Sequence, residues 1–143
     1  MRQAPFILSV QIPANAPMYD PSHAAEVVRL ADAAQIDLLV LGEFAIGAAP
    51  GSLDPPAFES IIVAAALAPL ARGVGLVAVV SALHAEPFHV ARAMSALDFL
   101  AAGRSGWLPT TAGADWGRYG GVGEVPVDEH LAKSADFIAA TES

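Results

Sequence analysis

The 143-residue sequence contains no cysteine, so disulfide bonds, thiolate metal sites and a cysteine nucleophile are excluded within it. It is also poor in positive charge. Seven Lys and Arg residues stand against fifteen Asp and Glu, and the formal net charge is −8. A protein that binds the phosphate backbone of nucleic acid needs a concentrated basic surface. We therefore expect no nucleic-acid partner.

Long hydrophobic runs are missing as well. A membrane-spanning helix takes about 18–20 consecutive apolar residues, and no such run occurs. The opening Met-Arg-Gln-Ala lacks the apolar segment and cleavage site of a secretory signal peptide. We expect a cytoplasmic protein with no membrane association.

What is abundant is apolar surface. Hydrophobic residues make up 55% of the sequence and charged residues only 15%. Residues 1–143 are enough for one domain with its own core, but a domain of this size does not normally hide so much apolar surface. The composition predicts that something else covers the excess.

Four short apolar runs predict β-strands, at residues 6–12, 36–42, 74–81 and 106–111. The first has the continuous apolar character of a strand with both faces covered. Acid-proline pairs predict helix starts between the strands, at Asp20-Pro21, Asp54-Pro55 and Glu86-Pro87. Asp128 is the expected N-cap of a last helix. Strands that alternate with helices at intervals of roughly 30 residues predict an α/β fold with a parallel sheet.

Each expected helix has a set of apolar residues at helical spacing that predicts its core face. The four sets are Val27, Leu30, Ala31 and Ala34; Phe58, Ile61, Ile62 and Ala65; Val90, Met94, Leu97 and Ala101; and Leu131, Ala135 and Ile138. Pro69 should stop the second helix because proline lacks a backbone donor. Gly103 should adopt the left-handed conformation that ends the third, with Arg104 complementing the helix dipole.

The region from the third helix to the fourth strand also carries a series of residue pairs in a characteristic order. They are Glu86-Pro87, Ala91-Arg92, Leu97-Asp98, Gly103-Arg104 and Gly106-Trp107. In this order and spacing the segment resembles the bacterial luciferase-like, flavin-dependent monooxygenases, in particular the nitrilotriacetate and sulfur-compound monooxygenase branch. The resemblance extends weakly over most of the chain but covers only the N-terminal half of a typical member.

This resemblance implies parallel (β/α) units of the TIM-barrel type, about four of the eight that close a barrel. Half a barrel leaves open strand edges and uncovered interior side chains. We expect completion by a homodimer or by a complementary half-barrel subunit. The alternatives are an open sheet that is stable alone and a truncated remnant of a longer protein.

The resemblance also implies a reaction: reduced FMN, supplied by a separate flavin reductase, and O2 oxygenate a small organic substrate. A deazaflavin, or no cofactor, remains an alternative. In parallel α/β folds, ligands bind where the strands end. The cofactor-binding candidates by resemblance are Glu43, Ser81 and Thr111. His84 is the catalytic candidate, as a general acid or base. No pair of histidines has metal-binding spacing, so we predict no metal.

The fourth strand departs from the family pattern. Leu108 occupies the position where the family has an asparagine that contacts flavin, and Pro109 predicts an edge or irregular strand. Trp107 is expected in the core. The sequence therefore leaves two functions open. One is a flavin-dependent monooxygenase, and the other is a non-catalytic relative that serves as an assembly subunit or is a remnant.

Overall fold

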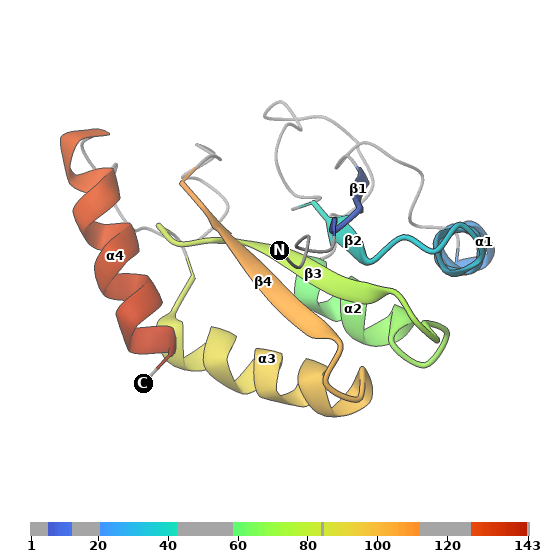
Figure 1. Ribbon diagram of the computed structural model, residues 1–143. Helices are drawn as coiled ribbons and strands as arrows, with labels where there is room; N and C mark the ends of the chain where they lie inside the picture. The colour runs from blue at the N-terminus through green and yellow to red at the C-terminus, as the bar shows by residue number, and fades with distance from the viewer. Residues whose placement is uncertain (1–5, 13–20, 43–58, 84, 112–126, 143) are drawn as a thin grey trace, which may run out of the picture.

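A computed structural model describes residues 6–12, 21–42, 59–83, 85–111 and 127–142. Its strands are β1 (Ser9–Ile12), β2 (Leu38–Leu41), β3 (Gly75–Ser81) and β4 (Ser105–Thr110). They form one sheet in the order β1-β2-β3-β4, and each neighbouring pair is parallel. The helices are α1 (Pro21–Ala33), α2 (Ser60–Leu67), α3 (Pro87–Leu100) and α4 (His130–Thr141), with a 3-10 turn, η2 (Val127–Glu129), before α4. The predicted α/β class and parallel sheet are confirmed (Figure 1).

The strand register gives the sheet two distinct faces. Ile12, Leu41, Ala78 and Trp107 lie side by side across the four strands. Because side chains alternate along a strand, this row and every second residue from it share one face. We call this the helix face, because its residues join the core that the helices build. The opposite face, which carries Ser81 and Leu108, is the open face.

Every one of the four α-helices contributes to the core on the helix face. Its members from the helices are Ala24, Val28 and Ala31 of α1; Ile61, Ala64 and Leu67 of α2; Val90 and Leu97 of α3; and Phe137 of α4. Among the described residues no helix packs its apolar side on the open face. In Figure 1, α2 and α3 accordingly lie together on one side of the sheet, and α1 and α4 flank it. Within the described part of the chain, the helices thus cover one side of the parallel sheet.

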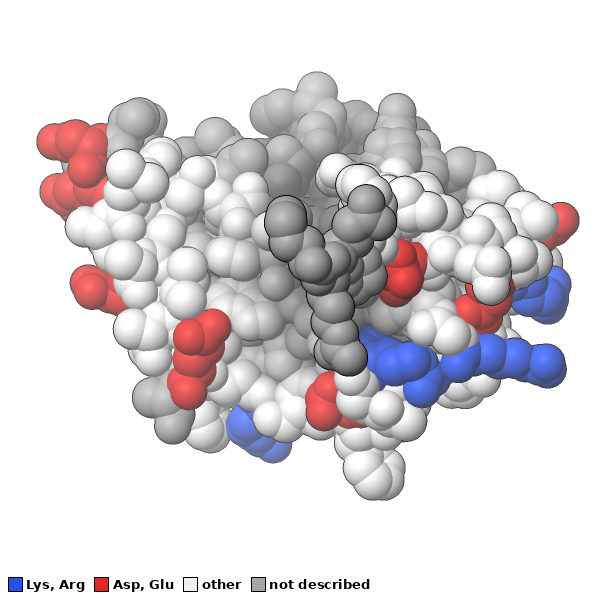
Figure 2. Space-filling model, in the orientation of Figure 1, with Lys and Arg blue, Asp and Glu red and all other residues white. Residues whose placement is uncertain are grey.

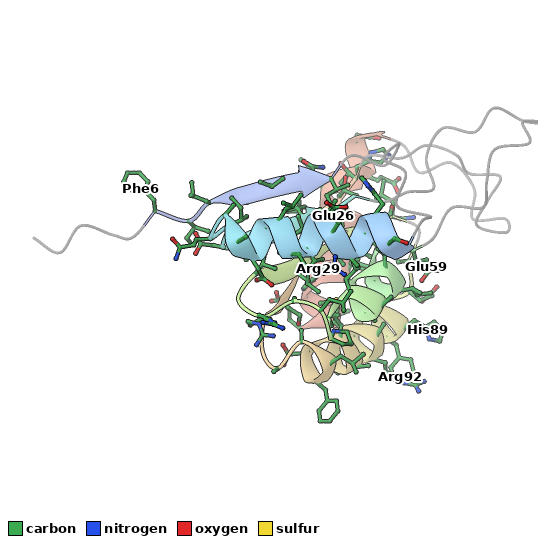
Figure 3. The ribbon with its side chains drawn as sticks, turned by 90° about the vertical axis from the view of Figure 1, so that its right-hand side faces the viewer. Phe6, Glu26, Arg29, Glu59, His89 and Arg92 are labelled. Atoms are coloured by element: carbon green, nitrogen blue, oxygen red, sulfur yellow. The ribbon has the colours of Figure 1, made fainter. Side chains whose placement is uncertain are left out.

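The first strand is shorter and more exposed than the sequence predicts. Pairing begins at Ser9, not at Phe6, and three of the four residues of β1 are exposed. The expectation of two covered faces is wrong for this strand, because Ile12 is the one residue of β1 that joins the core of the described residues. Phe6 is 94% exposed, and Figure 3 shows it projecting from the start of the strand, away from the helices.

Two predicted helix starts are also wrong. The helix that packs below β3 begins at Ser60, and its N-cap Glu59 has extended backbone, so Asp54-Pro55 does not start it. Residues 43–58 lie outside the described part. The last helix is capped by Glu129 rather than Asp128, because Asp128 is already within the 3-10 turn η2. The Glu86-Pro87 start of α3 is confirmed, and α2 ends at Leu67, just before Pro69.

The predicted core face is correct for α3 and only partly correct elsewhere. Val90, Leu97 and Ala101 are buried and Met94 packs against them, as expected. Among the other predicted core residues, several are exposed: Leu30, Ala34, Ile62, Leu131 and Ala135. The face of α4 is rotated toward Ser134 and Phe137, because the Phe137 ring meets Trp107 edge-on, with ring centroids 6.0 Å apart. Trp107 is half-buried against the core.

Two helices end in the same way. At the end of α1, the Ile36 amide donates to Ala31 and the Gln35 amide to Asp32, and Gln35 has a φ of 55°. At the end of α3, the Gly103 amide donates to Asp98 and the Ala102 amide to Phe99. Both sets of bonds are Schellman motifs. Gly103 does adopt a positive φ, 77°, but the first left-handed residue there is Ala102, with a φ of 52°.

Candidate functional site

The carboxyl ends of the strands bring two hydroxyl side chains together. Ser81 is the last residue of β3 and Thr110 the last of β4, and they are direct neighbours in the sheet register. Both lie on the open face, because they alternate with Val80 and Pro109. Ser81 is only 2% exposed and Thr110 is partly buried. Parallel α/β folds bind ligands at this end of the sheet.

Backbone hydrogen bonds hold this end of the two strands in place. The Ala82 amide donates to the Thr110 carbonyl at 2.9 Å, so pairing continues one residue beyond Ser81. The Ser81 carbonyl accepts the Ala85 amide at 3.2 Å, which turns the chain toward α3. The Ser60 hydroxyl, at the start of α2, donates to the Val79 carbonyl. The position of Ser81 is therefore set by the sheet and by two connecting segments.

The predicted site residues fare differently in the structure. Ser81 lies where the prediction requires, at the end of β3. Thr111 follows directly after β4 and is exposed, and the residue opposite Ser81 is Thr110. Glu43 and His84 lie outside the described residues. Thr110 was missed by the sequence analysis, although alternation counted forward from a core-facing Trp107 would have placed it on the same face as Leu108.

The open face of the described sheet carries no charged side chain. Its members are Ser9, Gln11, Leu38, Val40, Gly75, Val77, Val79, Ser81, Gly106, Leu108 and Thr110. The apolar part lies below the two hydroxyls, and Leu108 is 47% exposed there. This surface suits a flat, uncharged group that has polar atoms along one edge.

Pro109 leaves the β3–β4 ladder intact. The Leu76 amide donates to the Arg104 carbonyl and the Ala82 amide to the Thr110 carbonyl. In a parallel pair, alternate residues of one strand face the other strand. Even-numbered residues of β4 therefore bond to β3, and the nitrogen of Pro109 points to the outer edge, where proline is tolerated. The predicted edge strand is confirmed within the described sheet.

Charged groups gather at the opposite end, where the strands begin. The Asp32 carboxylate accepts the amides of Arg72, Gly73 and Val74 at 2.9, 2.8 and 2.8 Å. Burial acts to raise the pKa of Asp32, but these three hydrogen bonds and the nearby Arg104 guanidinium outweigh it, and the pKa is lowered. Arg104 itself donates to the Ala71 carbonyl at 3.0 Å. Figure 2 shows Lys and Arg gathered at the lower right, where β4 begins in Figure 1.

The charged side chains at this end hold backbone segments in place. In addition to the Asp32 contacts, the Asp37 carboxylate accepts the Leu8 amide at 2.8 Å and so anchors the segment before β1. In barrels of parallel βα units, the end where the strands begin serves stability and the opposite end serves function. Within the described ranges, no group of three His, Asp or Glu side chains is placed to hold a metal ion. None of the described helices is long and apolar enough to span a bilayer.

The strand order and the alternating helices define a chain built of TIM-barrel-type (β/α) units, and known proteins share this fold. No protein-family model matches the sequence. The N-acetyl-S-(2-succino)cysteine monooxygenase of Bacillus subtilis is 30% identical over 116 residues, which is 79% of this chain and 26% of that protein. Component A of the nitrilotriacetate monooxygenase of Aminobacter aminovorans is 29% identical over 135 residues, 83% of this chain and 30% of that protein.

Solved structures agree. The EDTA monooxygenase from Chelativorans sp. BNC1 superposes with a TM-score of 0.80 at 19% identity, over 95% of this chain and 36% of that one. A riboflavin lyase, solved with modified FMN and riboflavin, gives a TM-score of 0.77 at 26% identity, over 98% of this chain and 37% of that one. These relatives are luciferase-like, flavin-dependent monooxygenases, and the chain spans between a quarter and a third of the curated relatives' length.

Proposed function

We propose that this chain forms the flavin-ring-binding portion of a monooxygenase that uses reduced FMN and O2 to oxygenate a small organic substrate. A separate flavin reductase would supply the reduced FMN. The observation that carries the proposal is the Ser81–Thr110 pair at the carboxyl ends of β3 and β4, within a fold shared with flavin-dependent monooxygenases. That FMN is the flavin is supported by the modified FMN in the structure of the related riboflavin lyase.

The described residues suit the ring of a flavin better than its phosphate. Hydroxyls donate to carbonyl oxygens and accept from ring N–H groups without adding charge. A phosphate needs cationic side chains or a cluster of free backbone amides, and the open face has no charged side chain. When bound, the flavin supplies the redox chemistry, and the protein supplies orientation and a dry surface. The same ring contacts would serve a deazaflavin.

Glu43 and His84 belong to this proposal because each follows a strand of the sheet in the sequence. In the sequence, Glu43 follows Gly42, which comes directly after β2. His84 is the third residue after Ser81, the last residue of β3. Glu43 is proposed as a further cofactor-binding residue, together with the Thr111 hydroxyl, and His84 as the general acid or base. Each is a single position that an alanine variant tests directly.

Assembly is part of the same proposal. The open face presents the apolar side chains of Val40, Val77 and Leu108 with only partial cover. The strands at both edges of the described sheet have unpaired outer sides. Further barrel strands, from a second copy or from a complementary half-barrel subunit, would bury this surface and pair these edges. A site completed in this way would lie in the cytoplasm.

A second candidate is a non-catalytic relative that serves as an assembly subunit or is a remnant. Leu108 favours it, because a half-exposed leucine stands on the open face where the family resemblance expects an asparagine. An aliphatic side chain makes no hydrogen bond to a cofactor. The scaffold would then be kept for its association rather than for its chemistry.

The test is flavin retention, measured together with mass in solution. The purified chain is incubated with FMN, desalted, and examined by absorbance and by light scattering. A dimer that keeps flavin, and loses it in Ser81→Ala, supports the monooxygenase proposal. The exposed Ser95→Ala on α3 is the matched control. A chain that releases all FMN contradicts that proposal and leaves the non-catalytic function.

A further inference from the structure

We infer that the apolar side of α4 that carries Leu131 and Ala135 docks on β1 of a second copy of this chain, where it covers Val10. The inference rests on the assembly part of the proposed function and deepens it. It commits the partner to a second copy, and it places the contact on the helix face of the sheet rather than on the open face. Two incompletely covered surfaces of the chain carry it.

The first of these surfaces lies beside the buried stripe of α4. Leu131 precedes the buried Ser134 by three residues, and the half-buried Ile138 follows Ser134 by four, so the two apolar side chains lie on the same side of the stripe. In α1 and α2 the residue in the same position is buried, namely Ala25 and Ile61. Leu131 is 80% exposed. In this respect α4 differs from the earlier units of its own chain.

The direction in which this side of α4 faces follows from the handedness of the fold. Parallel strands joined by a helix form a right-handed crossover, so the same side of every helix is turned toward the next unit. Asp32 marks this side on α1, four residues after the buried Val28, and its carboxylate accepts the amide of Val74 in a later unit. Leu131 has the equivalent position on α4. It is therefore turned away from α3, toward the place of a strand beyond β4.

The second surface is the helix face of β1. Val10 is level with Leu39 of β2 and, through it, with Leu76 of β3. Both leucines are fully buried, but Val10 is 44% exposed and Leu8, just before the strand, is 55% exposed. The other three strands each have a described helix before them in the chain, whereas no described helix precedes β1. The helix face of β1 thus lacks cover on its outer side.

Each of these two surfaces supplies what the other lacks. The strands β1 and β4 lie at opposite edges of the sheet, and α4 lies beside β4, so α4 does not cover β1 of its own chain (Figure 1). A second copy related by a two-fold axis can place its β1 beside β4 and its β4 beside β1. Both contacts then form at once, and all strands stay parallel. Four strands from each copy give the eight that close a TIM-type barrel.

The test uses charged variants and light scattering of the purified chain, which should be a dimer. Leu131→Lys and Val10→Glu each place a charge in both copies of the contact, and each should raise the dimer Kd by about tenfold or more. An equal mixture of the two variants should restore the dimer. In the mixed dimer one contact is unmodified, and the other joins the introduced amine to the introduced carboxylate. Leu30→Lys, at a 61% exposed position of α1, is the matched control and should change the Kd less than about twofold.

Three results would overturn the inference. They are a monomeric unmodified chain, a dimer that Leu30→Lys weakens as much as Leu131→Lys, and a mixture of folded variants that stays monomeric. Circular dichroism checks the fold of each variant. If a charged variant unfolds, Leu131→Ser or Val10→Ser takes its place and should weaken the dimer in the same direction.

FMN retention, measured on the same samples, separates this contact from the proposed chemistry. A dimer that passes the variant tests but releases FMN supports the contact between α4 and β1 and contradicts the monooxygenase proposal. A monomer that retains FMN overturns the contact and leaves flavin binding in place.

Discussion

The carboxylate of Asp32 accepts the amide of Val74 at 2.8 Å, across 42 residues of sequence. Asp32 lies near the end of α1 and Val74 immediately precedes β3, so this bond joins the first unit to the third. The amides of Arg72 and Gly73 donate to the same carboxylate. One acidic side chain therefore satisfies three consecutive backbone donors of a loop, which fixes where β3 begins.

We predict that Asp32→Asn lowers the free energy of unfolding by about 1–2 kcal/mol. An amide keeps one acceptor oxygen but turns an NH2 donor toward the loop amides, and the charge is lost; the figure is reduced for the solvent exposure of the site. Urea denaturation measures the change. Asp136→Asn, on the exposed side of α4, is the control and should stay within about 0.5 kcal/mol. Equal values for the two variants would contradict the role of Asp32.

The same site predicts a pH dependence. The pKa of Asp32 in the folded chain is below the ordinary value of 3.8. A depressed carboxyl pKa contributes stability that is fully present above the unfolded pKa and is lost as the pH falls through the folded pKa. The stability difference between the unmodified chain and Asp32→Asn should therefore be constant from pH 7 down to about 5. It should shrink below pH 4, as followed by urea denaturation. A difference that persists at the lowest accessible pH would indicate packing rather than charge.

Ala102→Gly should stabilise the chain by about 0.5–1 kcal/mol. Ala102 holds a φ of 52°. The left-handed conformation costs a residue with a Cβ roughly 1–2 kcal/mol, and glycine avoids this cost. Glycine also loses more conformational entropy on folding, which offsets part of the gain. Ala96→Gly, at an exposed position inside α3, is the matched control and should destabilise. Thermal and urea unfolding give both values. A loss of stability in Ala102→Gly would mean that the Schellman geometry does not persist in solution.

Phe137→Ala should be the most damaging of these substitutions, with a loss of about 3 kcal/mol or more, because it removes a buried ring and its edge-on contact with Trp107. Phe99→Ala provides the comparison, since Phe99 is 86% exposed and its removal should cost less than about 0.5 kcal/mol. Near-ultraviolet circular dichroism and urea unfolding report the two changes. Similar effects for both rings would show that α4 does not dock on β4 as described.

The predicted losses of stability do not involve the charged side chains on the outer surfaces of α1 and α3. Figure 3 shows Glu26 and Arg29 on α1 and His89 and Arg92 on α3, on the outside of the helix layer. Arg92 lies over the Phe88 ring, 5.6 Å from its centroid, which is a local contact on one helix. Exposed charges of this kind contribute little to stability.

The sequence predicted a helix or strand well where the residues that determine it lie next to it in the sequence. Glu86-Pro87 starts α3, because the amide of the first helical residue has no partner within the helix and a proline there loses no hydrogen bond. This helix start depends on no other part of the chain. Rotation of a helix about its axis is different. Leu131 fits the apolar spacing of α4, yet it is 80% exposed, because Trp107 from another element decides which side is buried. Spacing alone favoured the side of Leu131 and Ala135, which is exposed.

The sequence by itself determined the parallel βα architecture, the family resemblance and the place of Ser81 at the end of β3, since strand runs, helix starts and strand ends are all local patterns. Only the tertiary structure decided which residues meet. Sheet register set Thr110, not Thr111, opposite Ser81, and a shift of one residue would move every side chain of β4 to the other face. The hydrogen bond from the Val74 amide to the Asp32 carboxylate likewise forms only after distant segments pack, because its two partners are 42 residues apart in the sequence.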